Sequence, residues 1–168
     1  AKLIYIRRNG VDAASSLLTR ERNRWREERN DARYLQIRPL MGRWQDLFKS
    51  MESFESYLFS TRCLTLHDAF ELWEEYVAQG ERLFTSYSGP KLALRYERLI
   101  ADPAGQLDLV ARFCDLPATA SSIARSARGI NTGRAHAFLA DETLCRFYGE
   151  VKDSPWMRAL GYDAIPAT

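Results

Sequence analysis

The chain has 168 residues, of which 46% are hydrophobic and 12% aromatic, and its 24 Lys and Arg residues nearly balance 22 Asp and Glu residues. This composition excludes an intrinsically disordered chain, which has few aromatic residues and a lopsided charge. A net charge of +2 gives no reason to expect a nucleic-acid partner, and no apolar run approaches the roughly 18 residues of a transmembrane helix.

The chain opens with an apolar run that predicts a strand over residues 2–7. The run lacks the polar alternation of a half-exposed strand, so we expect both of its faces to be covered. Asn9-Gly10 predicts the end of the strand, and Asp12 is expected to cap the helix that follows. Because the sequence starts directly in a strand, we expect an N-terminal part of the fold to precede it.

Two segments follow whose roles are harder to assign. Residues 20–33 mix six arginines with four acidic residues, which favours a solvated helix face over a binding surface. Residues 34–63 are rich in aromatic side chains but have poor periodicity. Three interpretations of this second segment stay open: a lid, an acceptor-binding insertion, or irregular segments that cover the core.

The second half of the chain has a clearer pattern. A helix with one apolar face is predicted from Thr65, and Ser88-Gly89-Pro90 ends it. A short strand is predicted over residues 92–96. Asp102-Pro103 then supplies a cap and a first-turn proline for the next helix, and Asp141 begins another.

This order of elements predicts the fold class. Two strands that each feed a capped helix indicate an α/β fold, with a parallel sheet flanked by helices. We expect a single domain over residues 1–168, because this length is typical of one compact core. Two strands alone make a poor sheet, so the fold is expected to be incomplete in this chain.

The cysteines bear on location. Cys114 and Cys145 fall at apolar helical positions, and the three cysteines of the chain share no metal-ligand spacing. We interpret Cys114 and Cys145 as small core residues of a protein from a reducing compartment, and therefore predict a cytoplasmic location.

Arg8 and Ser16 are the first candidates for chemistry. Arg8 stands where the opening strand leaves the sheet, and Ser16 lies in the following helix. In open α/β sheets, ligands bind beyond the carboxyl ends of the strands, and a helix N-terminus favours an anion. A guanidinium and a hydroxyl there could converge on one phosphate. On this pattern alone, ordinary structural roles for both residues are the alternative.

The same residues carry a resemblance to a known family. Arg8-Asn9, Asp12 and Ser16 resemble the 3′-phosphate-binding motif of sulfotransferases that use 3′-phosphoadenosine-5′-phosphosulfate (PAPS). Residues 94–103 resemble the strand and Tyr-Glu-x-Leu-x-x-Asp-Pro segment of that family. Three further matches are Trp73, the Phe-x-x-Leu-Pro segment at residues 113–117, and Leu160-Gly161-Tyr162, which is similar to the end of many bacterial members.

The resemblance implies a P-loop-like α/β fold and transfer of a sulfuryl group from PAPS. The acceptor would be a hydroxyl or amine of a carbohydrate, glycolipid or small molecule, and no metal would be needed. By resemblance, Arg8 and Ser16 would hold the 3′-phosphate and Tyr96 would lie near the adenine. A core role for Tyr96 is the alternative.

A late segment offers further cofactor-binding candidates. The family's Arg-Lys-Gly-x-x-Gly segment has its nearest match at residues 128–134, with different spacing and no lysine. Arg128 and Gly129 are the candidates carried over, and Arg134 is an alternative. A surface loop without a binding role explains this segment equally well.

The departures from the family concern catalysis. The family's 5′-phosphosulfate loop and its usual catalytic base, a His or Glu, normally precede the matched segment and are not visible here. We expect neither histidine of the chain, His67 or His136, to be the base. The chain is therefore expected to be the C-terminal portion of a sulfotransferase, supplying the 3′-phosphate and adenosine half of the cofactor site.

Two other functions remain as alternatives. One is a non-catalytic nucleotide-binding relative that keeps the fold. The other is a helical interaction domain, which a sheet of fewer than three parallel strands, or Arg8 and Ser16 facing apart, would favour. The acceptor, the catalytic base and a homo-oligomeric state stay open.

Overall fold

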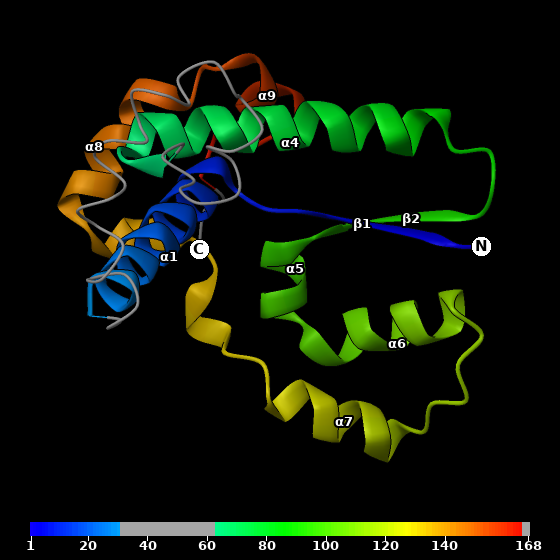
Figure 1. Ribbon diagram of the computed structural model, residues 1–168. Coiled ribbons are helices and arrows are strands. Elements are labelled where there is room, and N and C mark those ends of the chain that lie inside the picture. Colours follow the sequence, from blue (N-terminus) through cyan, green and yellow to red (C-terminus); the bar gives the residue numbers. More distant parts are fainter. Residues whose placement is uncertain (31–62, 166–168) are drawn as a thin grey trace. The chain divides into compact units, whose positions relative to one another are not determined.

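The computed structural model describes residues 1–30 and 63–165, with side chains omitted for residues 24–30 (Figure 1). The chain divides into two compact units, one formed by residues 1–13 and 73–168 and the other by residues 14–72. The helices α1 (Gly10–Asn30) and α4 (Leu66–Ser86) each pass from one unit into the other. Apart from Cys63, the segment predicted as a lid or acceptor-binding insertion lies outside the described residues.

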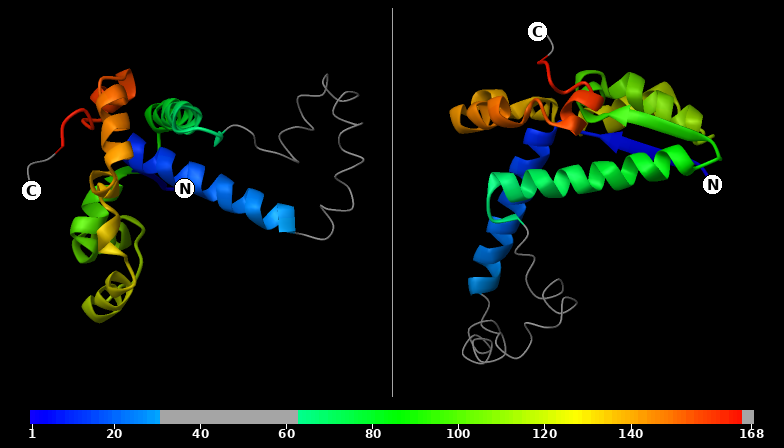
Figure 2. Two further views of the ribbon diagram at one scale, coloured as in Figure 1. Left: turned by 90° about the vertical axis from the view of Figure 1, so that its left-hand side faces the viewer. Right: turned by 90° about the horizontal axis from the view of Figure 1, so that it is seen from above.

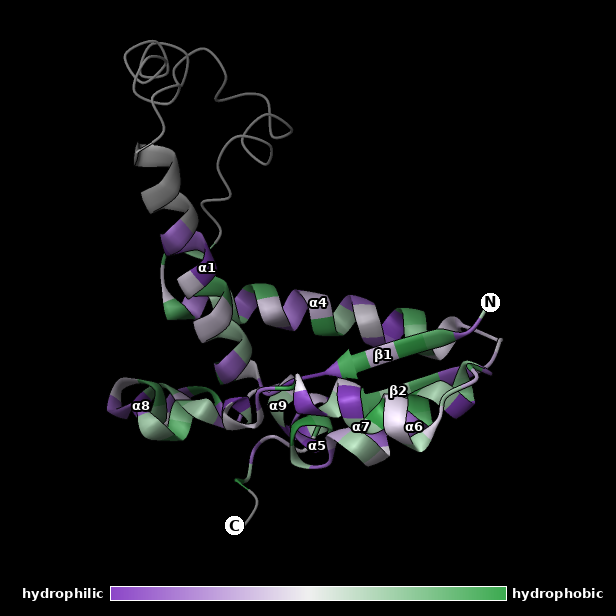
Figure 3. Cartoon of the chain, turned by 90° about the horizontal axis from the view of Figure 1, so that it is seen from below, coloured by the Kyte–Doolittle hydropathy of each residue, from purple (hydrophilic) through white to green (hydrophobic). Residues whose placement is uncertain are grey.

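The sheet of the first unit confirms the α/β class. β1 (Leu3–Arg7) and β2 (Lys91–Arg95) run parallel, side by side, with Arg7 opposite Arg95 (Figures 1 and 2). β1 is hydrophobic up to its last residue (Figure 3). Since parallel strands end at the same edge of a sheet, the residues after Arg7 and after Arg95 emerge together.

Two details of the strands differ from expectation. Ile6 is 52% exposed, so one face of β1 is less covered than predicted among the described residues. Tyr96, expected in the second strand, is instead the first residue of α5 (Tyr96–Ala101). The described residues form a sheet of two strands, the outcome that on its own would favour a helical interaction domain.

α1 begins earlier than predicted because a different residue caps it. The Asn9 side-chain oxygen accepts hydrogen bonds from the backbone N–H groups of Val11 at 2.9 Å and Asp12 at 3.5 Å. Asp12 lies in the first turn, and its carboxylate accepts the backbone N–H of Phe138 at 3.0 Å. Asp12 is therefore a buried tie to a distant segment, and its predicted capping role was wrong.

Three other helices begin at strong caps. The Asp102 carboxylate accepts the Gly105 N–H at 3.0 Å at the start of α6 (Pro103–Phe113), as predicted. The Asp141 carboxylate does the same for α8 (Glu142–Val151), which also matches its prediction. At the start of α4, Thr65 and Asp68 each bond the other's backbone N–H.

Two short helices of the first unit were not predicted. α7 (Ala120–Arg128) has no buried residue, although its apolar residues Ile123, Ala124 and Ala127 recur at helical spacing. α9 (Pro155–Ala159) spans only five residues. α7 packs on α6, and two 3-10 turns follow it: η2 (Thr132–Arg134) packs against α5, and η3 (Ala137–Ala140) packs against α8.

The second unit contains the rest of α1 and the start of α4. Among the described residues of this unit, the buried ones come from α1, from α4 and from the position of Cys63 just before α4: Ala14, Leu18, Glu21, Cys63, Ala69, Phe70 and Leu72. Cys63 is the buried cysteine, whereas Cys114 and Cys145 are only partly buried, so their predicted core role was overstated. In the part of the chain described, no helix has the length and apolar character needed to span a bilayer.

Candidate functional site

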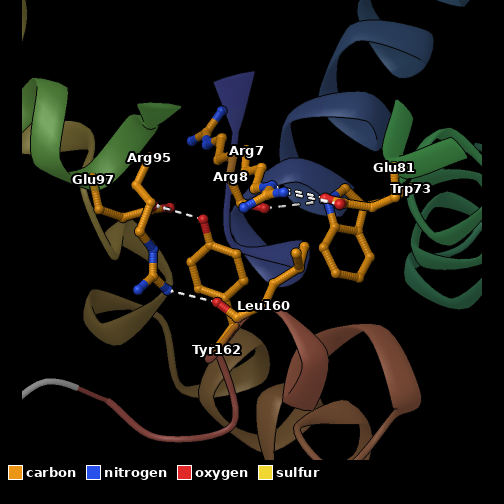
Figure 4. Close-up of polar contacts among 8 residues, drawn as sticks. All are labelled: Arg7, Arg8, Trp73, Glu81, Arg95, Glu97, Leu160 and Tyr162. Atoms are coloured by element: carbon orange, nitrogen blue, oxygen red, sulfur yellow. Dashed lines mark hydrogen bonds and ion pairs between the residues drawn. The ribbon is translucent and has the colours of Figure 1, made fainter. Parts of the chain in front are cut away.

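The two arginines at the end of β1 have different environments (Figure 4). The Arg7 guanidinium forms an ion pair with Glu81, with Nε 2.7 Å from Oε1, and also contacts the Tyr5 and Phe84 rings. Among the residues that the structure describes, no carboxylate forms an ion pair with Arg8. Arg7 is therefore a structural tie, whereas Arg8 has no such ion pair with a described carboxylate.

Arg8 is held on two sides. Its backbone carbonyl accepts the indole N–H of Trp73 at 3.2 Å, and Trp73 is 5% exposed (Figure 4). Its guanidinium carbon lies 4.6 Å from the centre of the Tyr96 ring. Such stacking orients the guanidinium plane. The structure thus brings Arg8 and Tyr96 together, as the prediction of a shared cofactor site requires.

The N-terminus of α1 is occupied by the protein's own groups. Asn9 caps the Val11 and Asp12 N–H groups, and the Asn9 N–H itself donates to Glu97 Oε1 at 2.8 Å. The favourable potential at this helix end therefore acts on Asp12 and Glu97, both buried carboxylates. An anion bound nearby would have to be neutralised by side chains.

Asp12 lies among several charged groups. Burial raises the pKa of its carboxyl, while the Phe138 N–H and the charges of Arg8 and His136 lower it and Glu97 raises it further. Asp12 Oδ2, Arg8 Nε and His136 Nδ1 are buried atoms without a hydrogen-bond partner among the described residues. The backbone of His136 adopts the left-handed conformation, with φ of 50°. The ionised form of Asp12 is thus disfavoured by folding.

This pKa shift predicts how stability depends on pH. A raised pKa in the folded state means that stability falls as pH rises from the ordinary value of 3.8 through the raised value, and is constant above it. Asp12→Asn keeps an acceptor for the Phe138 N–H but cannot ionise. As pH rises from 3.8 through the raised pKa, the stability of this variant relative to wild type should therefore increase, and above that pKa the difference should stay constant. Melting temperatures of both proteins against pH test this, and parallel curves would contradict it.

The other predicted site residues are Ser16, which belongs to the other unit, and three residues of the late segment. Ser16 is exposed on α1 and belongs to the unit of residues 14–72, so its pairing with Arg8 stays a prediction. Arg128 is exposed at the end of α7, and Gly129 has φ of −79°, which any residue can adopt. Arg134 is exposed in η2, beside the helix that Tyr96 begins.

Sequence reasoning missed the residues that connect the site. Glu97 Oε2 accepts the Tyr162 hydroxyl at 3.0 Å (Figure 4). Arg95 stacks over the Tyr162 ring at 4.4 Å and donates to the carbonyls of Leu160 and Gly161. Glu97 and Tyr162 were noted only as parts of motifs. Glu97 itself was the signal that could have found this network: it is a carboxylate within a predicted core segment, and a buried charge needs hydrogen-bond partners.

A comparison with known families identifies the chain. A family model described as a sulfotransferase domain matches residues 1–132, which include Arg8, Ser16 and Tyr96. No curated protein and no solved structure matches the chain. The family match covers most of the sequence and outweighs the two-stranded sheet as a guide to function. The chain therefore belongs to the sulfotransferase domain family, whose members are transferases that move a sulfuryl group.

Proposed function

We propose that this chain forms the 3′-phosphate and adenosine half of a PAPS site in a sulfotransferase. The observation that carries the proposal is the Arg8 guanidinium, which lies over the Tyr96 ring at 4.6 Å and forms no ion pair with any described carboxylate. Arg8 and Tyr96 follow the ends of two parallel strands, where α/β folds bind ligands. An available arginine beside an aromatic ring suits a nucleotide with an extra phosphate.

Each residue has a distinct part in this proposal. Arg8 binds the 3′-phosphate as a planar, charged donor, and the Ser16 hydroxyl adds a neutral hydrogen bond. The half-exposed ring of Tyr96 orients Arg8 and lies near the adenine. Because Asp12 and Glu97 already occupy the helix end, the guanidinium supplies most of the charge that the phosphate needs.

The late segment contributes through Arg134 in this proposal. η2, which contains Arg134, packs against α5, the helix that Tyr96 begins. α7, which ends at Arg128, packs instead on α6. Arg134 is therefore the better placed of the two arginines to reach the nucleotide, and Gly129 has no conformation that requires glycine.

The reaction we propose moves the sulfuryl group of PAPS to a hydroxyl or amine of a carbohydrate, glycolipid or small-molecule acceptor. When bound, PAPS supplies this group and leaves as 3′-phosphoadenosine-5′-phosphate. The described residues bind and orient the nucleotide, and we assign the proton-transfer step to none of them. A cytoplasmic location stays a prediction, and so does contact of the acceptor with residues 34–63. The buried Trp73 supports Arg8, because its indole N–H donates to the Arg8 carbonyl.

A binding comparison tests the proposal. Isothermal titration of the complete protein with 3′-phosphoadenosine-5′-phosphate and with AMP isolates the contribution of the 3′-phosphate. We expect the bisphosphate to bind about 10-fold or more tightly, because one charge-assisted contact contributes about 1.5–3 kcal/mol. Equal affinities for the two nucleotides would contradict the proposed 3′-phosphate site.

A further inference from the structure

We propose that Glu97 and Tyr162 are positioning residues, which fix Arg8 and Tyr96 relative to each other for the 3′-phosphate of the nucleotide. This inference rests on the proposed function and extends it to the C-terminal segment of the chain. Tyr162 lies beyond the residues matched by the family model, 1–132. The geometry that supports this role lies within one compact unit.

Glu97 links the two backbones that carry the proposed binding residues. Its Oε1 accepts the N–H of Asn9, the residue after Arg8, at 2.8 Å. Its own backbone directly follows Tyr96. One buried carboxylate therefore sets the spacing between the end of β1 and the start of α5, and with it the contact between guanidinium and ring.

The second oxygen of Glu97 is fixed by Tyr162. The Tyr162 hydroxyl donates to Oε2 at 3.0 Å, and Tyr162 is 2% exposed (Figure 4). Burial and the neighbouring Glu97 both raise the pKa of this hydroxyl, so it remains a donor. Each carboxylate oxygen thus has a donor, which is the condition for keeping a buried charge.

Tyr162 is itself held rigidly by the end of α9. Gly161 has φ of 66°, and the Tyr162 N–H donates to the Met157 carbonyl at 2.7 Å, the pattern of a Schellman motif. The Tyr148 hydroxyl donates to the Tyr162 carbonyl at 3.0 Å. Arg95, the last residue of β2, stacks on the Tyr162 ring. The hydroxyl therefore reaches Glu97 from a backbone that is already in place.

Stability alone does not account for this arrangement. Replacing buried polar groups with well-packed apolar ones is often neutral or stabilising, so a buried carboxylate is weak support for a purely structural role. What it supplies here is a defined direction for two bonds, one from the Asn9 N–H and one from the Tyr162 hydroxyl. We infer that this directional control serves the orientation of Arg8.

The test measures selectivity for the 3′-phosphate, which is the affinity for 3′-phosphoadenosine-5′-phosphate divided by that for AMP. Tyr162→Phe keeps the buried ring and removes one donor, so selectivity should fall about 3–10-fold, with AMP affinity little changed. In an Arg8→Ala background, Tyr162→Phe should cause no further loss, since the group that it positions is gone. A loss of selectivity that persists in the Arg8→Ala background would mean that Tyr162 acts by a route other than Arg8, which would contradict the positioning role.

Tyr87→Phe is the matched control, because it also removes a tyrosine hydroxyl that donates to a protein oxygen, the Ala1 carbonyl, and this hydroxyl contacts neither Glu97 nor Tyr162. It should lower the melting temperature and leave selectivity unchanged. Glu97→Gln offers a second variant: its amide can accept from Asn9 and donate to the Tyr162 oxygen, so selectivity should stay at least at the wild-type value.

The outcomes separate the two proposals. Wild type that binds both nucleotides equally would refute the proposed 3′-phosphate site itself. Wild type that prefers the bisphosphate, together with unchanged selectivity in Tyr162→Phe, would refute only the positioning role. Loss of selectivity in Tyr87→Phe to the same extent would also refute it. Glu97→Gln keeps the test decisive if Tyr162→Phe does not fold, because reduced selectivity in that variant would contradict the role.

Discussion

Arg8→Ala is expected to weaken binding of 3′-phosphoadenosine-5′-phosphate by about 10–150-fold in the complete enzyme, because a charge-assisted contact of about 1.5–3 kcal/mol is lost. AMP affinity should change little, since AMP lacks the phosphate that Arg8 is proposed to hold. Calorimetry with both nucleotides measures the two effects. Unchanged affinity for the bisphosphate would remove Arg8 from the site.

Arg7→Ala is the matched control for this prediction. Arg7 is the preceding residue and has the same side chain, but it is paired with Glu81 at 2.7 Å. Its removal leaves the Glu81 carboxylate without this partner, so a loss of stability is expected while selectivity for the 3′-phosphate stays as in wild type. If both substitutions lowered selectivity equally, general positive charge at the end of β1 would explain the binding better than Arg8 itself.

Local sequence signals predicted the elements well where the physics is local. Asp102-Pro103 and Asp141 each cap a helix through bonds to N–H groups two or three residues away, so the pattern is complete within a few residues. The parallel pairing of β1 and β2 followed from the order of strands and helices. α7 was missed although its apolar residues recur at helical spacing, because the segment is otherwise polar and none of its residues is buried.

The site was harder to predict because its contacts are distant in sequence. Asn9 and Asp12 are equally good capping residues, and the choice depends on Phe138, which lies 126 residues beyond Asp12. Glu97 and Tyr162 are 65 residues apart. The position of Arg8 at a strand end made it a candidate, but only the resemblance to a family gave it a binding role, since a strand-ending arginine is common. Arg7 could not be distinguished from it until the ion pair with Glu81 was known.

Trp73→Ala is expected to give the largest loss of stability, about 3–5 kcal/mol, because it removes a large buried side chain and leaves a cavity. Trp73 is 5% exposed, and its indole N–H donates to the Arg8 carbonyl. Trp73→Phe keeps much of the ring burial and removes that donor, so it should cost less, about 1–3 kcal/mol. Urea unfolding of wild type and both variants measures these free energies.

Selectivity for the 3′-phosphate shows whether Trp73 affects the proposed site as well as stability. If Trp73 supports Arg8 through its N–H as well as through packing, Trp73→Phe should also lower selectivity for the 3′-phosphate, although most of the buried area is kept. Leu72, the buried residue that directly precedes Trp73 in α4, provides a control, since Leu72→Ala costs stability by cavity formation without removing a donor to Arg8. Equal selectivity in Trp73→Phe and Leu72→Ala would mean that Trp73 acts by packing alone, and the Arg8 carbonyl would then need no fixed donor to keep the guanidinium in place.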